Sequence, residues 1–139
     1  YYKVLGKAVK SGLFDVIAHL DIYRKYGLAF YGEEILTAHR GLVEPVLRLM
    51  VENDVGMEIN TALLRKGHTE FSPNLEILNL ALKMNVKITF YGSDAHKVSH
   101  LGKDIEEAYL MVEKLKKGAV TKLECKNFVF APSRQKSPK

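Results

Sequence analysis

The segment Tyr91 to His96, Tyr-Gly-Ser-Asp-Ala-His, presents a carboxylate and an imidazole two positions apart. It follows the apolar run Val86 to Phe90, which is typical of a buried strand. In extended backbone, residues i and i+2 point to the same side, so Asp94 and His96 can converge on one metal ion or on two neighbouring ions. The pair alone is weak evidence, because a strand end with a hydrogen-bonded polar turn looks the same in sequence.

A second apolar run ends in the same two residue types in the opposite order. Phe14 to Leu20 is rich in apolar and β-branched residues and predicts a strand that reaches His19, with Asp21 two positions further. A lone histidine at a strand end is usually a hydrogen-bonded core residue. When two strands both end in an imidazole and a carboxylate, each makes the metal-site interpretation of the other stronger. Together they favour a metal site.

A third short run, Val55 to Asn60, also ends in polar groups, with Glu58 and Asn60 followed by Arg65. A glutamate inside a buried strand costs free energy unless it is paired or hydrogen-bonded, so a structural salt bridge is the alternative to a site role. Arg24 and Arg65 each follow a predicted strand end by a few residues. Both can reach over the same edge of a sheet, or lie on the surface as solvated arginines.

Helices are expected between these strands, and a helix also precedes the first one. Helical patterns cover Tyr1–Val9, Gly32–Arg40, a segment from Pro45, a segment from Pro73 to Asn85, and Lys103–Lys117; Tyr23 to Gly27 is expected to be an exposed loop, and Asn127–Phe130 a last short strand. Alternating strands and helices predict an α/β fold with a parallel sheet and right-handed crossovers. Functional sites in such folds lie at the carboxyl ends of the strands, where the polar residues gather.

Length and composition predict one globular domain of 139 residues. The net charge of +5 arises at the carboxyl end, because residues from Lys114 onward include eight Lys or Arg and one Glu. Residues 1–113 therefore carry a net charge of about −2. This distribution argues against a nucleic-acid partner and predicts a basic, solvated tail at residues 131–139, with a phosphate-binding arm as the alternative. The single cysteine, Cys125, excludes an internal disulfide.

The chain has no apolar run near the roughly 20 residues of a membrane span and no start that looks like a signal peptide. We therefore expect no membrane partner and a cytoplasmic location. The first residue is Tyr1, in what looks like the middle of a helix, which predicts that the sequence begins inside a longer protein.

Three blocks of the chain closely resemble the polymerase-and-histidinol-phosphatase (PHP) family. They are Phe-Asp-Val-Ile-Ala-His-Leu-Asp at 14–21, Met-Glu-Ile-Asn-Thr-Ala-Leu-Leu-Arg-Lys at 57–66, and Gly-Ser-Asp-Ala-His-Lys at 92–97. The second and third blocks together look most like the histidinol-phosphate phosphatase branch. The blocks occur in the family's order, and the resemblance extends to about Gly118, so residues 1–130 are expected to be the carboxyl-terminal half of such a domain.

The resemblance implies a distorted seven-stranded, TIM-like (β/α) barrel that holds usually three divalent metal ions and hydrolyses phosphate monoesters, here L-histidinol phosphate. His19, Asp94 and His96 match metal ligands, and Asp94 can also act as a catalytic proton shuttle. Four further residues match positions near the cluster or on the substrate: Arg24 and Arg65 at the phosphate, and Glu58 and Asn60 beside them. Mixed imidazole and carboxylate ligands suit Zn, Fe or Mn.

The family's opening His-x-His block and its bridging glutamate have no counterpart here, and His39, His68 and His100 fall on predicted surface segments. A full barrel needs about 200 or more residues. We therefore expect the missing amino-terminal half to supply further ligands and strands, the isolated chain to be inactive, and an oligomer to be possible. Two alternatives remain open: a PHP-type phosphoesterase acting on nucleic-acid ends or nucleotides, and a non-catalytic remnant that binds a partner.

Overall fold

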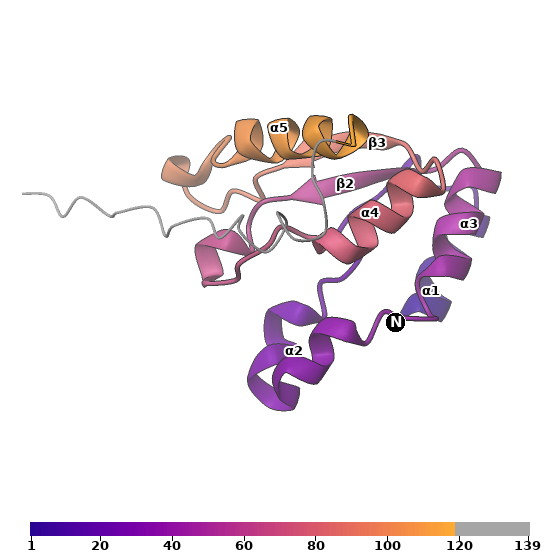
Figure 1. Cartoon of the computed structure of the whole chain (residues 1–139), viewed down its shortest axis with the longest axis horizontal. Helices are drawn as coiled ribbons and strands as arrows, with labels where there is room; N and C mark the ends of the chain where they lie inside the picture. The colour runs from indigo at the N-terminus through magenta and orange to yellow at the C-terminus, as the bar shows by residue number, and fades with distance from the viewer. Residues whose placement is uncertain (119–139) are drawn as a thin grey trace, which may run out of the picture.

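The structure, a computed structural model, describes residues 1–118 as a three-stranded parallel sheet with helices packed around it (Figure 1). In chain order the elements are α1 (Tyr2–Lys10), β1 (Val16–Ile17), α2 (Arg24–Tyr31), the 3₁₀ helix η1 (Gly32–Thr37), α3 (Glu44–Glu52), β2 (Gly56–Asn60), η2 (Leu64–Lys66), α4 (Leu75–Lys83), β3 (Ile88–Gly92), η3 (Val98–His100) and α5 (Ile105–Lys116). The expected α/β class with a parallel sheet is confirmed. The predicted strand Asn127–Phe130 and tail 131–139 lie outside the described residues.

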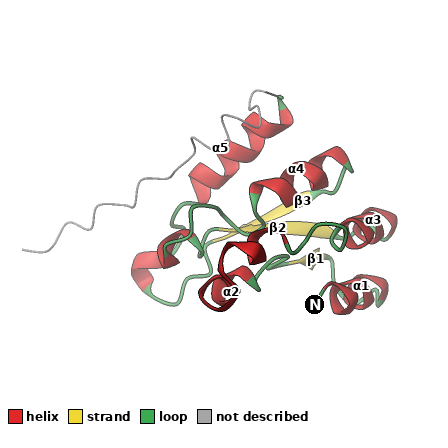
Figure 2. Cartoon of the chain, turned by 60° about the horizontal axis from the view of Figure 1, so that its bottom comes forward, coloured by secondary structure: helices red, strands yellow, loops and turns green. Residues whose placement is uncertain are grey.

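The sheet has the order β1-β2-β3, with β2 in the middle (Figure 2). Val16 pairs with Gly56 at the start of the β1–β2 ladder. Along β2 and β3, Met57 pairs with Ile88 but Glu58 pairs with Phe90, so β3 carries one extra residue at this point. Such a bulge turns side chains of the bulged strand relative to its partner. All three strands run in the same direction, so their carboxyl ends share one edge of the sheet.

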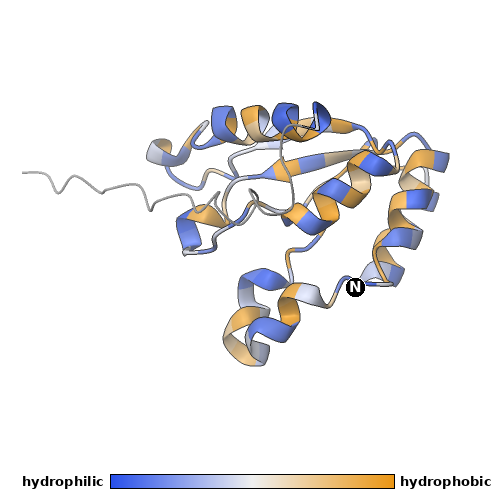
Figure 3. Ribbon diagram, in the orientation of Figure 1, coloured by the Kyte–Doolittle hydropathy of each residue, from blue (hydrophilic) through white to orange (hydrophobic). Residues whose placement is uncertain are grey.

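The core forms between the sheet and the amphipathic helices. Met57 and Ile59, on one face of β2, are completely buried, as are Leu47 of α3, Leu78 of α4 and Val112 of α5. Helix α1 packs on α3, and α5 packs on β3. In Figure 3, hydrophobic (orange) and hydrophilic (blue) segments alternate along α3, α4 and α5. This is expected of helices that bury one face and expose the other to solvent. None of the helices in the described part of the chain is long and apolar enough to cross a membrane.

Several helix starts follow ordinary capping rules. The side chain of Asn74 accepts a hydrogen bond from the Ile77 amide at 2.9 Å and so caps α4. Pro45 occupies the first turn of α3, where its missing N–H costs no hydrogen bond. These local signals explain why the starts of these two helices lie within one or two residues of the predicted positions.

Several segments differ from the sequence expectation. The first strand, expected from Phe14 to Leu20, covers only Val16–Ile17, and the third, expected from Val86 to Phe90, is observed at Ile88–Gly92. Residues 24–31 form α2 rather than an exposed loop, because the Arg24 side chain is buried and anchors the start of this helix. The segment Gly32–Arg40, where a helix is expected, forms a 3₁₀ helix over residues 32–37. Gly27 allows the two elements to pack closely, since a Cβ at this position would lie 2.7 Å from Cγ1 of Ile35.

Candidate functional site

The carboxyl ends of the three strands bring three of the predicted blocks to one edge of the sheet. His19 follows β1 by two residues, Asn60 is the last residue of β2, and Asp94 follows β3 by two residues. His19 and Asp94 both have left-handed backbone, with φ of 54° and 47°. This conformation is uncommon for residues other than glycine and turns the chain sharply as it leaves each strand.

Asp21 is the centre of a buried polar network just beyond β1. One carboxylate oxygen accepts a hydrogen bond from Oγ of Ser72 at 2.5 Å, and the other accepts one from the Asn74 amide at 2.8 Å. That second oxygen also lies 2.7 Å from Nε of Arg24. The network therefore joins the end of β1 to α2 and to the segment that leads into α4.

Arg24 is buried, and all three nitrogens of its guanidinium face protein partners. Besides Asp21, Nη1 donates to the Glu70 carboxylate at 3.3 Å and Nη2 donates to the Phe71 carbonyl at 2.5 Å. The sequence placed Arg24 at the substrate phosphate. In this arrangement no face of the guanidinium is directed to solvent, so the geometry favours a structural role and gives that contact no support.

His19 and Glu58 each keep one buried polar atom without a hydrogen-bond partner, Nδ1 of His19 and Oε2 of Glu58. The other carboxylate oxygen of Glu58 accepts a hydrogen bond from Nδ2 of Asn60 at 3.3 Å, and Oδ1 of Asn60 accepts one from the Ala62 amide at 3.0 Å. Gly92 makes space for this carboxylate, because a Cβ there would lie 2.1 Å from Oε1 of Glu58. Such atoms can mark a place where a further group binds, but they are not specific to this edge, because Arg24, His39 and Glu44 also have at least one.

Arg65 lies where the ends of β2 and β3 meet, with 11% of its side chain exposed. Nη2 donates to the carbonyl of Ser93, and Nη1 lies 3.3 Å from Oγ1 of Thr61 and 3.9 Å from Oδ2 of Asp104. Ser93 directly precedes Asp94. The structure therefore joins the predicted phosphate ligand Arg65 to the backbone beside the predicted catalytic carboxylate.

Asp94 and His96 lie together but point in part to solvent. Nδ1 of His96 is 2.9 Å from the carbonyl oxygen of Asp94 and 3.9 Å from its Oδ1, and 79% of the histidine side chain is exposed. The imidazole is thus turned back onto its own loop. Both residues are accessible at the edge of the sheet.

Positive charge gathers near Asp94. The contact between the side chains of Lys25 and Lys66 raises the pKa of Lys25 and lowers that of Lys66, and the charge of Asp94 acts on both amino groups. The pKa of His100 lies below its usual value, first through lost hydration and then through the charge of Arg65. An edge with several cations around one carboxylate is suited to an anionic ligand.

The described residues do not by themselves form a metal centre. Within residues 1–118, no group of three or more His, Cys, Asp or Glu side chains could hold an ion. The described residues therefore offer no complete set of three or more ligands of their own. The convergence of His19, Asp94 and His96 on a shared cluster stays a prediction, to which the unpartnered atoms of His19 and Glu58 add support.

Three residues that contact Arg65 are not among the predicted site residues: Thr61, Ser93 and Asp104. Thr61 lies among the polar residues that follow the strand, and nothing in its type or position distinguishes it as a partner of Arg65. Asp104 looks like an ordinary helix cap in sequence. One predicted surface histidine was placed wrongly: His39 is 1% exposed, with Nε2 3.5 Å from the Glu76 carboxylate.

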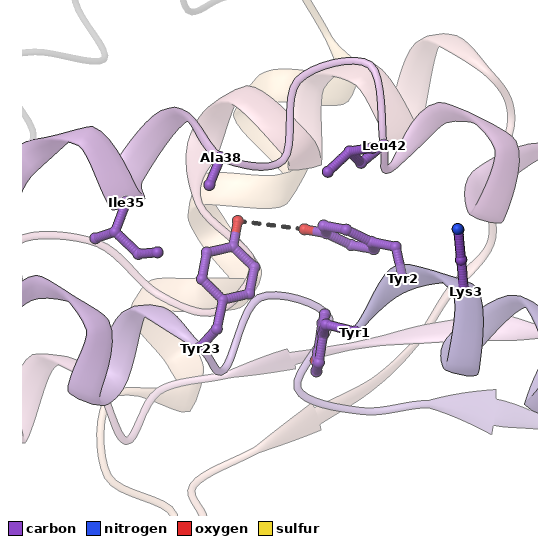
Figure 4. A pocket seen from close by; sticks show the side chains of 7 residues that line it. All are labelled: Tyr1, Tyr2, Lys3, Tyr23, Ile35, Ala38 and Leu42. Carbon is purple, nitrogen blue, oxygen red and sulfur yellow. Dashed lines mark hydrogen bonds between the residues drawn. The ribbon is translucent and has the colours of Figure 1, made fainter. Parts of the chain in front are cut away.

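A separate pocket of about 300 Å³ lies between α1 and the segment from Tyr23 to Leu42 (Figure 4). Tyr1, Tyr2 and Tyr23 line it, and the hydroxyls of the latter two lie 3.3 Å apart. Burial raises the pKa of all three phenols, that of Tyr1 to about 12. The Tyr1 hydroxyl also donates to the carbonyl of His19, but none of the predicted site residues lines the pocket.

Comparison with known proteins identifies relatives of one kind. No protein-family model matches the chain. A probable histidinol-phosphatase of Thermotoga maritima is 36% identical over 101 residues, which are 73% of this chain and 41% of the relative. Proteins with the same description in Deinococcus radiodurans and Clostridium acetobutylicum are 29% identical over 102 residues and 28% identical over 115 residues, covering 73% and 81% of this chain and 36% and 44% of the relatives.

The chain thus spans about two fifths of the length of the curated relatives it matches. The match falls in their carboxyl-terminal portion, which agrees with the expected position of the three blocks. On these grounds the chain belongs to the histidinol-phosphatase-like (PHP) family.

Proposed function

We propose that the protein containing this chain is a phosphomonoester hydrolase that converts L-histidinol phosphate and water into L-histidinol and phosphate. In this proposal, residues 1–130 belong to the carboxyl-terminal half of a distorted seven-stranded (β/α) barrel. The parallel sheet with polar strand ends supports the architecture, and the names of the three relatives support the reaction class. The substrate and the closed barrel are parts of the proposal.

The observation that carries the proposal is the link between Arg65 and the backbone of Ser93, directly before Asp94. A guanidinium can bond two phosphate oxygens at once and offset their charge. A carboxylate beside it can take a proton from the attacking water and return one to the departing alkoxide as the ester P–O bond breaks. Asp94 is accessible enough for this role, and its neighbour Arg65 is fixed by three contacts.

Dependence on divalent metal ions is also part of the proposal. A cluster of Zn, Fe or Mn would supply an activated water and neutralise charge on the phosphate. His19, Asp94 and His96 are proposed ligands, with the remaining ligands contributed by the rest of the protein. Because the described residues form no metal centre of three or more ligands, we propose that residues 1–139 alone are inactive.

The test is phosphate release by the full-length protein, loaded with Mn, Fe or Zn, from L-histidinol phosphate. We expect Asp94→Asn to lower kcat by roughly 10² to 10⁴, the usual contribution of a positioned acid or base. Asp54→Asn is the matched control, because Asp54 also has left-handed backbone, with φ of 57°, but is 75% exposed and lies before β2 rather than after a strand. Removal of metal with a chelator is expected to abolish turnover.

Full activity of Asp94→Asn would remove Asp94 from the mechanism. Release of phosphate from oligonucleotide ends but not from L-histidinol phosphate would replace the proposed substrate with nucleic acid. Absence of release from every phosphate monoester tried, with each metal, would favour the non-catalytic alternative and overturn the proposal.

A further inference from the structure

Asp104 occupies the N-cap position of α5 but does not cap the helix. Aspartate at this position usually has extended backbone and accepts a hydrogen bond from an amide two or three residues on. Asp104 instead has left-handed backbone, with φ of 62° and ψ of 12°, and makes no side-chain cap hydrogen bond. Asp104 thus lacks the usual capping hydrogen bond and also has an unfavourable backbone conformation. A stabilising contact elsewhere is expected to compensate for both.

The compensating contact is with Arg65. Oδ2 of Asp104 lies 3.9 Å from Nη1 of Arg65, and the two side chains are only 23% and 11% exposed. At this level of exposure, charges are screened less by water and salt than at an open surface. The carboxylate therefore acts on the guanidinium from the side of α5, whereas Thr61 and Ser93 contact it from the ends of β2 and β3.

These four residues, Thr61, Arg65, Ser93 and Asp104, form what we call the strand-end clamp. Oγ1 of Thr61 also donates to the Lys103 carbonyl at 2.8 Å, and the Gly102 amide donates to Oγ of Ser93 at 3.2 Å. The loop between positions 93 and 104 is thus closed at its base, with Asp94 and His96 inside it. A change at Asp104 reaches Asp94 through a single intervening side chain.

We propose that Asp104 is a positioning residue, which holds the Arg65 guanidinium, and through it the Ser93–Asp94 backbone, in the orientation that receives the substrate phosphate. The inference rests on the proposed phosphatase function and adds to it a residue with no direct contact to substrate. It predicts that Arg65 binds phosphate well only while Asp104 fixes one side of its planar fork, because the two hydrogen bonds of the fork require a set orientation.

Asp104→Asn gives a test in which the direction of the change in phosphate affinity decides between three possible roles of Asp104. Asparagine tolerates left-handed backbone and keeps the shape of the side chain, so the change removes mainly the charge. Asp104 is itself an anion, and if it acted only by repelling phosphate, the variant would bind phosphate more tightly. If it served only the helix, phosphate affinity would not change. A positioning role predicts weaker binding despite the lost repulsion, by about fivefold or more in the dissociation constant.

The measurement is calorimetric titration of the full-length protein with inorganic phosphate. Glu107→Gln is the matched control, since it removes the same charge from an exposed position in the first turn of α5. Asp104→Gly is the second variant; glycine relieves the left-handed backbone, so the protein should stay folded while phosphate binding weakens as in Asp104→Asn. Unchanged or tighter phosphate binding in both Asp104 variants overturns the proposal.

Hydrogen exchange of the amides from Ser93 to Gly102, without phosphate, gives a readout that does not depend on the reaction. Loss of the clamp should speed exchange in this loop in Asp104→Asn and leave it unchanged in Glu107→Gln. If the wild-type protein neither binds phosphate nor releases it from monoesters, the proposed function fails, and this exchange still reports on the clamp. Equal loop exchange in wild type and Asp104→Asn overturns the role of Asp104 with or without phosphatase activity.

Discussion

Replacement of Asp21 by asparagine is expected to destabilise the fold more than any surface substitution. Asp21 is completely buried and serves three partners: the Ser72 hydroxyl, the Asn74 amide and the Arg24 guanidinium. Asparagine keeps one acceptor oxygen but turns the other into an N–H donor. That donor can face the Ser72 hydroxyl, which is able to accept, so the main loss is the charge: the buried guanidinium is left without its closest anion.

The expected loss in the free energy of unfolding follows from the burial of the Asp21–Arg24 ion pair. Removal of one partner from a buried ion pair costs about 3–5 kcal/mol, because the remaining charge stays desolvated. Arg24 keeps the Glu70 carboxylate and the Phe71 carbonyl, so we expect the lower end, about 3 kcal/mol. With an m-value near 2 kcal/mol/M, the midpoint of urea unfolding should fall by about 1.5 M.

The assay is urea unfolding of wild type, Asp21→Asn, Arg24→Met and the double variant, with Asp15→Asn as an exposed control from the same segment. The two single changes should couple by more than about 1 kcal/mol, because each removes the other's partner. A shift for Asp21→Asn no larger than that of Asp15→Asn would refute the reasoning. A raised KM for Arg24→Met without loss of stability would restore the predicted phosphate contact of Arg24.

Two further predictions concern the strand edge and the tyrosine pocket. Gly92→Ala should lower the free energy of unfolding by about 1–3 kcal/mol, measured by thermal unfolding, because the new methyl group would displace the Glu58 carboxylate. Gly6→Ala is the control. Its Cβ would meet only Leu49 at 3.4 Å, so this change should not be destabilising. Stability should also fall as the pH rises from about 10 to about 12, since Tyr1 keeps its proton in the folded state while the unfolded chain loses it. Ultraviolet titration of the phenols in the native protein and at high urea checks this, and coincident curves would contradict it.

Much of the fold follows from local patterns in the sequence. Val55–Asn60 was predicted as a strand and β2 covers Gly56–Asn60, because its apolar residues alternate with residues held by neighbours. The strand expected at Val86–Phe90 is observed at Ile88–Gly92, shifted toward the site. The apolar run was also expected to be buried, but β3 is an edge strand of the described sheet and Phe90 is 56% exposed. Hydrophobicity therefore located the strand only approximately, because its ladder with β2 extends through Tyr91 and Gly92.

The site was predictable in its residue types and less so in its contacts. Arg65 and Asp94 were expected at the same edge, because parallel strands end together, and the structure places them there. Arg24 looked equivalent to Arg65 in sequence, but tertiary contacts with Glu70 and Phe71 bury it. A pattern along the chain does not indicate which of two arginines will find such partners 46 or 47 positions away.

The left-handed backbone at His19 and Asp94 has a consequence for the stability of the chain. Each such residue carries a penalty of roughly 1–2 kcal/mol relative to glycine, which accepts this conformation freely. Glycine at these two positions would relieve the backbone but would remove the imidazole and the carboxylate. His19→Gly and Asp94→Gly are therefore natural places to look for a trade of activity against stability.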